Sequence, residues 1–191
     1  MAENSSMLIA EAQREVRSVY SGGFFGQLIS SILWLTAAAL GTWVSVRAAI
    51  ITLVVGGFFI FAALTVLLRL LGRPARVSAR NPLHYLGMQV AFVLPLSMLL
   101  LVLVAEFRLN WFFPAMMVLL GAHYLPFTFL YGMRSFIALS ALLIAAGVII
   151  ALWFSLTFSL GGWVAGVLLL LFAFVGRAEA ARTSGAGNLP N

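Results

Sequence analysis

Six long apolar runs dominate this chain, and the joints between them, with the two chain ends, hold most of its charged residues. In chain order the runs are Phe24–Val44, Ala48–Leu71, Pro82–Ala105, Trp111–Tyr131, Ser135–Trp153 and Ser159–Gly176. Each is close to the ~20 residues that an α-helix needs to cross the hydrocarbon core of a bilayer. The runs lack the alternation of apolar and polar residues that barrel strands require, which excludes a β-barrel. We therefore predict an all-α integral membrane protein, a bundle of six transmembrane helices.

The scarcity of charge and the absence of cysteine limit the classes of function. Only 8% of the residues are charged, whereas a soluble domain carries about 25%. All eleven basic residues are arginine, and their position between the runs favours contact with anionic lipid over nucleic acid. The lack of cysteine excludes disulfides, thiolate metal sites and cysteine nucleophiles. Two histidines without nearby acids make a poor metal site, so we expect no metal and no cofactor.

The arginines are distributed unequally between the two sides of the predicted bundle. Nine lie before the first run, between the second and third, between the fourth and fifth, and after the sixth. Only Arg47 and Arg108 lie on the opposite side. Because cytoplasmic segments of membrane proteins carry an excess of arginine and lysine, we predict that both termini are cytoplasmic.

We expect a single transmembrane domain over residues 1–191. It would comprise a cytoplasmic amphipathic arm over 1–22, the six-helix bundle over 24–176 and a disordered polar tail over 183–191. Helical spacing puts five apolar residues of the arm on one face: Leu8, Ala12, Val16, Val19 and Tyr20. Such a short amphipathic helix suits an anchor that lies on the membrane interface or extends the first span. A regulatory or partner-docking arm is the alternative.

A single histidine lies near the middle of the fourth run. The midpoint of Trp111–Tyr131 is residue 121, so at about 1.5 Å per residue His123 lies roughly 3 Å from the bilayer midplane. Ionisable side chains are costly at that depth and generally face protein or water. His123 is therefore a candidate for ligand binding or pH sensing, and a purely structural hydrogen bond is the alternative.

Several other polar side chains are predicted to line a cavity with His123. They are Gln27 and Trp34 in the first run, Gln89 in the third, and Tyr124, Thr128 and Tyr131 in the fourth. Pro126 has no N–H to donate and so frees the backbone carbonyl of Ala122, beside His123. Ordinary hydrogen bonds between helices account for the same pattern, so a cavity and a packed interface both remain open.

Two groups of charged residues lie at the ends of the predicted helices. Glu106 is the only acid between the runs and lies two residues from Arg108, which indicates an interfacial ion pair or, alternatively, a gate. The second group is a juxtamembrane cluster of four arginines: Arg69, Arg73, Arg76 and Arg80. Such a cluster can contact anionic lipid, although setting the membrane topology is a sufficient role for it. No carboxylate lies within a run, which argues against transport of ions on buried acids and against a two-carboxylate enzyme.

Three stretches of the fourth run and its flanks resemble the signature of a known family. They read Asn-Trp-Phe-Phe-Pro over 110–114, then Gly-Ala-His-Tyr-Leu-Pro-Phe over 121–127 and Leu-Tyr-Gly-Met over 130–133. Tyr-Ser-Gly-Gly over 20–23, Gly26, Trp34 and Asn-Pro-Leu over 81–83 fit the same resemblance. The family consists of small bacterial multi-span inner-membrane proteins of unknown function. The resemblance implies a bacterial inner-membrane location and supplies no activity.

Two functional hypotheses from different classes follow. The first is a protein that binds or transports a small neutral or amphipathic molecule through a polar cavity around His123, since no buried charge is available to hold an ion. The alternative is a non-catalytic accessory or scaffold subunit of a larger membrane complex. Membrane lipids are the expected partners, and a homodimer or larger complex remains open. An enzyme ranks third, because only His123 could act as an acid or base.

Overall fold

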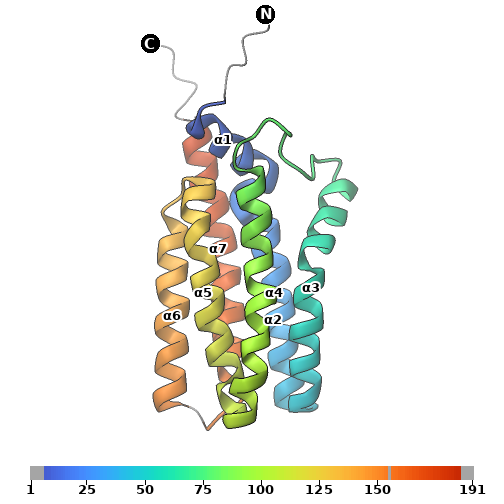
Figure 1. Ribbon diagram of the computed structural model, residues 1–191, viewed down its shortest axis with the longest axis vertical. Helices are drawn as coiled ribbons and strands as arrows, with labels where there is room; N and C mark the ends of the chain where they lie inside the picture. Colours follow the sequence, from blue (N-terminus) through green and yellow to red (C-terminus); the bar gives the residue numbers. More distant parts are fainter. Residues whose placement is uncertain (1–6, 155, 186–191) are drawn as a thin grey trace, which may run out of the picture.

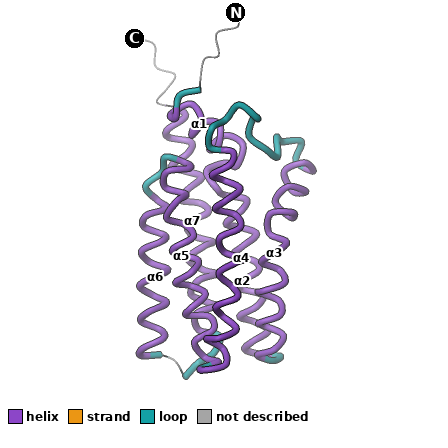
Figure 2. Tube along the Cα trace, viewed as in Figure 1, coloured by secondary structure: helices purple, strands orange, loops and turns teal. Residues whose placement is uncertain are grey.

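The computed structural model describes residues 7–154 and 156–185, and within them the chain is a bundle of upright helices (Figure 1). In chain order the helices are α1 Ile9–Tyr20, α2 Phe24–Trp43, α3 Val46–Leu70, α4 His84–Phe107, α5 Phe112–Tyr131, α6 Ser135–Trp153 and α7 Leu160–Gly185. Two short 3-10 turns, η1 Ser21–Gly23 and η2 Leu109–Trp111, precede α2 and α5. The described part of the chain holds helices and loops and no strand (Figure 2).

Among the described residues, six helical stretches are long and apolar enough to cross a membrane, the first running from α1 into α2. This confirms the predicted all-α fold with six such segments, and α2 to α7 begin within two residues of their predicted starts. The largest difference lies in α7, which continues past the predicted end at Gly176 to Gly185. The first residues of the predicted disordered tail are therefore helical, and residues 186–191 lie outside the described part.

The long helices pack in a definite order of neighbours. α2 packs against α3 and α7, α7 against α6, α6 against α5, and α5 against α4, whereas α3 and α4 touch each other only slightly. Helix α1 and the last turns of α7 lie at one end of the bundle, which we call the α1 end (Figure 1). We call the opposite end, where α2 meets α3 and α6 meets α7, the far end. α3 is the least covered helix: 6% of its most apolar stretch is buried.

Small residues bring α5 and α6 into direct contact. An added Cβ at Gly121 would lie 2.9 Å from the Ser140 carbonyl oxygen, and one at Gly147 would lie 2.8 Å from that of Pro114. The Ser140 hydroxyl donates to the Gly121 carbonyl at 2.7 Å, so the close approach is also hydrogen-bonded. Packing of small residues, reinforced by hydrogen bonds, is the usual source of helix association in membranes.

The amphipathic helix predicted in the arm is α1, and of the two expected placements it does not take the one that extends the first span. Its apolar residues Ala12, Val16 and Val19 are buried against the bundle, so protein and not lipid covers this face. The chain then turns sharply through η1, where Ser21, Gly22 and Gly23 have φ values of 51°, 65° and 86°. Three consecutive left-handed residues break the helix, which is why α1 crosses the end of the bundle and does not extend α2.

Candidate functional site

Most of the buried polar side chains among the described residues lie in the half of the bundle nearest the α1 end. α2 begins at that end and buries Gln27, Ser30 and Ser31 in its first two turns. α5 finishes at that end and buries Tyr124 and Tyr131 in its last two turns. We refer to five residues as the buried polar cluster: Gln27, Ser30, Tyr124, Thr128 and Tyr131.

Aromatic rings of α5 and α6 form the walls of this cluster. Phe136, in the first turn of α6, stacks on Tyr124 with ring centroids 6.0 Å apart and lies 5.0 Å from the ring of Tyr131. The Tyr124 side chain is within hydrogen-bonding reach of Ser30 across the α2–α5 boundary. Tyr131 is close enough to interact electrostatically with Tyr124 and with Tyr20 of α1. Residues far apart in the sequence thus meet in one small volume.

On α2 and α5, three polar side-chain atoms are buried without a hydrogen-bond partner among the described residues. They are Gln27 Oε1, His123 Nδ1 and Thr128 Oγ1. The Gln27 side chain as a whole is only 4% exposed. An unpaired polar group in an apolar interior costs about 1–3 kcal/mol by mutational measurements. A bound water or a small polar ligand would remove that cost, so these atoms mark the candidate binding site.

His123 is half-buried and faces α4 instead of the polar stripe of α2. Its ring lies 5.6 Å from Tyr124 and 5.1 Å from Phe127, and its side chain makes a hydrogen-bonding contact with the backbone of Val90. Val90 is buried on α4. The histidine therefore links α4 to α5 at the edge of the buried polar cluster.

The other predicted cavity residues are placed differently from one another. Trp34 is buried farther along α2, with its ring 5.9 Å from that of Phe113. Gln89 is exposed on α4, so its side chain points away from the buried polar cluster. The structure thus brings Tyr124 and Tyr131 together, with Ser30 of α2 within reach, and leaves Gln89 outside. Their role in binding a ligand stays a prediction.

The predicted charged groups all lie at the ends of the bundle. Glu106 and Arg108 are exposed at the far end, and no ion pair joins them in the described structure. Arg108 instead lies over the ring of Trp111, with its guanidinium carbon 4.9 Å from the ring centroid. The four predicted lipid-contact arginines, Arg69, Arg73, Arg76 and Arg80, are exposed at the α1 end. Arg73 also donates to the Ser18 carbonyl at 2.9 Å.

Polar side chains of α1 close the α1 end over the buried polar cluster, a feature that the sequence reading missed. Gln13 donates to the Phe129 carbonyl at 2.6 Å, and Arg17 donates to the Tyr131 carbonyl. These are carbonyls of the last turn of α5, which have no partner within their own helix. The sequence signal was only a polar helix face, which does not name a partner.

Glu15 of α1 joins the arm to the loop between α3 and α4. Its carboxylate accepts from the Ser78 backbone at 2.6 Å and from the Asn81 side chain at 2.8 Å. Asn81 is itself buried and also donates to the Ala12 carbonyl. Burial raises the pKa of Glu15, but the hydrogen bonds from Ser78 and Asn81 outweigh it, so the net pKa lies below the usual value.

Glu179 makes a matching contact on the other side of the α1 end. Its carboxylate accepts from the backbone N–H groups of Arg134 and Ser135, at 3.0 and 3.2 Å. These donors open α6, so a side chain from α7 caps that helix and complements its dipole. Glu179 lies in the part of α7 that extends beyond the predicted span. The α1 end is therefore tied by polar contacts from α1, the α3–α4 loop and α7.

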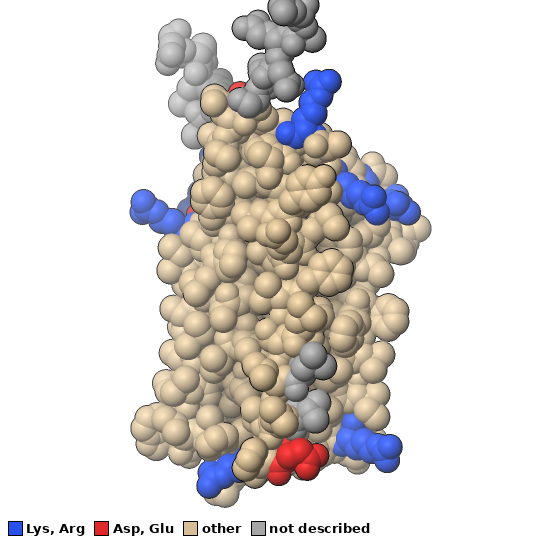
Figure 3. All heavy atoms as spheres, viewed as in Figure 1, with Lys and Arg blue, Asp and Glu red and all other residues tan. Residues whose placement is uncertain are grey.

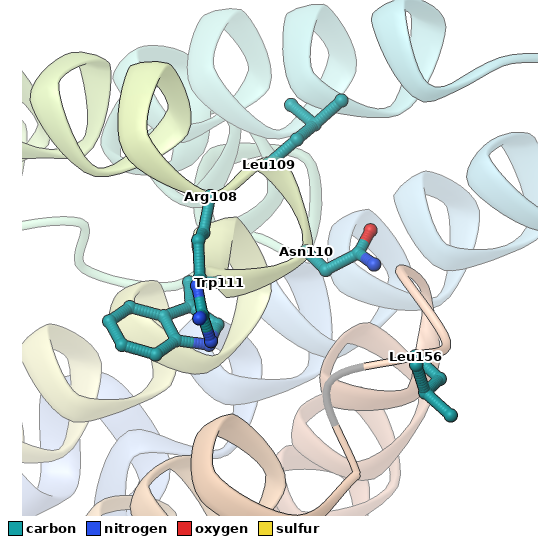
Figure 4. A pocket seen from close by; sticks show the side chains of 5 residues that line it. All are labelled: Arg108, Leu109, Asn110, Trp111 and Leu156. Carbon is teal, nitrogen blue, oxygen red and sulfur yellow. The ribbon is translucent and has the colours of Figure 1, made fainter.

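Two shallow hollows lie at the far end, on either side of Leu109 in η2. The first, of about 300 Å³, is lined by Arg108, Leu109, Asn110, Trp111 and Leu156 (Figure 4). The second, of about 520 Å³, is lined by Val46, Arg47, Ile50, Ile51 and Leu109. Neither hollow is lined by a residue of the buried polar cluster or by His123, around which the sequence predicts a cavity. In the described residues no three His, Cys, Asp or Glu side chains come together in a way that could hold a metal ion.

This fold and this interior define a class: a helical bundle with six segments apolar enough to span a membrane and a buried polar cluster closed at one end. A family model matches residues 9–179, from the start of α1 to the last turns of α7. The chain therefore belongs to that family, a family of unknown function (DUF7010). Comparisons with curated proteins and with solved structures found no match. Membership of a family of unknown function is thus found as expected, while the signature motif, bacterial origin and inner-membrane location stay predictions.

Proposed function

We propose that this protein binds a small neutral or amphipathic molecule at the buried polar cluster and transports it across the membrane. The observation that carries the proposal is the trio of buried, unpartnered atoms on α2 and α5: Gln27 Oε1, His123 Nδ1 and Thr128 Oγ1. Gln27 Oε1 is an acceptor, and the hydroxyl of Thr128 can donate or accept. A ligand with both donors and acceptors would satisfy them. No acid or arginine belongs to the cluster, which favours a neutral ligand.

We further propose a bacterial inner-membrane location with both termini cytoplasmic. Nine of the eleven arginines belong to segments at the α1 end, and Arg47 and Arg108 belong to the far end. Charged side chains lie toward the two ends of the bundle, and the middle of the face shown in Figure 3 carries none. This distribution supports an orientation with the α1 end in the cytoplasm.

The test is to identify small molecules retained by the purified protein. The full chain would be extracted from membranes with detergent. Small molecules retained by wild type, Gln27→Leu and Thr128→Val would then be compared by mass spectrometry. The proposal expects a retained neutral species that both variants lose. Ser97→Ala is the matched control, because its exposed hydroxyl bonds only the Val93 carbonyl of its own helix. Equal retention by wild type and variants would contradict the proposal.

The alternative, a non-catalytic accessory or scaffold subunit, would use a different surface. α3 leaves large apolar side chains exposed, among them Phe58, Phe59 and Phe61. A helix of a partner protein could cover this face, as lipid would. Purification from native membranes in mild detergent separates the two functions. A stoichiometric partner protein would favour the scaffold, and a monomer that keeps a small molecule would favour the binding function.

A further inference from the structure

The far end of the bundle carries an arrangement that the proposed function does not use. Its two hollows share Leu109 as a common wall, so they lie next to each other around η2. Each hollow contains one arginine: Arg108 in the first and Arg47 in the second. These are the two arginines that the sequence places at this end. The remaining lining is mostly apolar, with Asn110 as the polar exception.

Both guanidinium groups are available to an anion. In the described chain neither Arg47 nor Arg108 forms an ion pair, although Glu106 is exposed at the same end. Arg108 rests on the face of Trp111, a contact worth about 0.5–1 kcal/mol at an exposed site. Charge-assisted hydrogen bonds from arginine to phosphate are stronger, so a phosphate can displace the ring as the partner of Arg108.

Trp111 adds a second donor beside Arg108. Its indole Nε1 is buried, and no acceptor for it occurs in the described residues. In Figure 4 the Arg108 guanidinium overlaps the nitrogen-bearing part of the Trp111 ring. A phosphate that binds Arg108 in place of the ring would therefore lie close to the Trp111 N–H and could accept a hydrogen bond from it. Tryptophan at a predicted membrane interface is in the usual place for contacts with lipid headgroups.

The surfaces below the hollows suit acyl chains. The second hollow is walled by Val46, Ile50 and Ile51 at the start of α3. Below it α3 and α4 barely touch, and both expose apolar side chains, such as Val55 on α3 and Leu100 on α4. A free phosphate has no apolar part that could pack against these side chains. A molecule with an anionic head and apolar tails matches both the arginines and the walls.

We propose that the far end binds the head group of an anionic phospholipid, with Arg108 of the first hollow and Arg47 of the second as its cationic contacts, and that the acyl chains lie along α3 and α4. The site is separate from the buried polar cluster, and its ligand belongs to the leaflet opposite the predicted lipid-contact arginines of the α1 end. The arginines supply the charge, Asn110 and Trp111 supply further donors, and Leu109 separates the two hollows.

Native mass spectrometry of the full chain in detergent tests the proposal, with phosphatidylglycerol, phosphatidylcholine and inorganic phosphate as three separate probes. We expect wild type to retain phosphatidylglycerol in preference to phosphatidylcholine and to ignore inorganic phosphate. The double variant Arg47→Gln/Arg108→Gln should retain roughly tenfold less phosphatidylglycerol. Arg47→Lys/Arg108→Lys, which keeps the charge, should retain most of it. Inorganic phosphate that competes with the lipid would overturn the assignment to a phospholipid.

The matched control removes the same charge from the α1 end. Arg14→Gln/Arg182→Gln alters two exposed arginines and leaves both hollows intact. If this control loses as much phosphatidylglycerol as Arg47→Gln/Arg108→Gln does, retention reflects net charge and the far-end site is wrong. Leu109→Ser tests the apolar wall without changing charge, and it should also weaken retention. Helix content by circular dichroism must match wild type in every variant compared.

Discussion

The two ends of the bundle are held by different interactions. At the α1 end, Gln13, Glu15, Arg17 and Glu179 make directional polar contacts between segments far apart in the chain. At the far end the contacts are mainly aromatic, such as Phe113 with Phe158, at 5.1 Å between ring centroids. Polar contacts require fixed partners, whereas aromatic packing accepts small shifts. The α1 end is therefore closed by specific contacts, whereas the far end is adaptable and leaves hollows.

The largest effect is expected where η1 meets α7 at the closed end. A Cβ at Gly22 would lie 2.5 Å from the Gly176 carbonyl oxygen, and Gly22 has a φ of +65°. Gly22→Val should therefore destabilise the protein by roughly 3 kcal/mol or more, through both overlap and backbone strain. The free energy of unfolding in mixed micelles measures it. Gly72→Val is the control for strain alone, because Gly72 has a φ of +66° and no atom within 4 Å of an added Cβ. Equal losses would show that the close approach has no energetic weight.

The next effect concerns the link between the arm and the α3–α4 loop. Glu15→Ala removes the acceptor for Ser78 and Asn81 and leaves the Asn81 amide buried with one partner fewer. We expect a loss of about 1–3 kcal/mol, together with faster proteolysis of the arm. Thermal unfolding measures the loss of stability, and limited proteolysis measures the rate at which the arm is cleaved. Glu11→Ala, which removes a carboxylate bonded to Leu8 of the same helix, should change both much less. An unaltered arm in Glu15→Ala would mean that apolar packing alone holds the closed end.

Acid should loosen the closed end through the same carboxylate. Because the folded-state pKa of Glu15 lies below its ordinary value of 4.5, its contribution to stability is present above pH 4.5 and is lost as pH falls through the lowered pKa. The difference in melting temperature between wild type and Glu15→Gln should therefore shrink between about pH 5 and pH 3. A constant difference over that range would exclude this linkage.

The smallest effect is expected at the far end. Arg108→Gln removes a contact between an exposed cation and the Trp111 ring, so unfolding should become easier by no more than about 0.5–1 kcal/mol. Thermal unfolding in detergent without added lipid measures it, and Asn110→Ala provides a second small change beside it. A loss as large as that of Glu15→Ala would remove the distinction between the two ends.

The sequence predicted the long helices well because their signal is local. α6 runs from Ser135 to Trp153, as predicted, since a continuous apolar run between polar joints has little other structure available in a bilayer. The candidate site was less predictable. Helical spacing predicts the polar face that carries Gln27 in the first run and the one that carries Tyr124 in the fourth, but it does not tell which helix each face meets. Gln89 had a comparable polar character, yet its face of α4 turned outward.

By itself the sequence determined the six apolar helices, their lengths, the bias of arginine toward one side and the amphipathic nature of the arm. Each of these depends on residues close together in the chain. The tertiary structure decided that α1 buries its apolar face in protein, that α5 and α2 share a buried polar cluster, and that Glu15 and Glu179 tie the closed end. These depend on contacts between residues more than forty positions apart. No local pattern encodes such pairings, because many polar partners are chemically equivalent until packing brings one of them within reach.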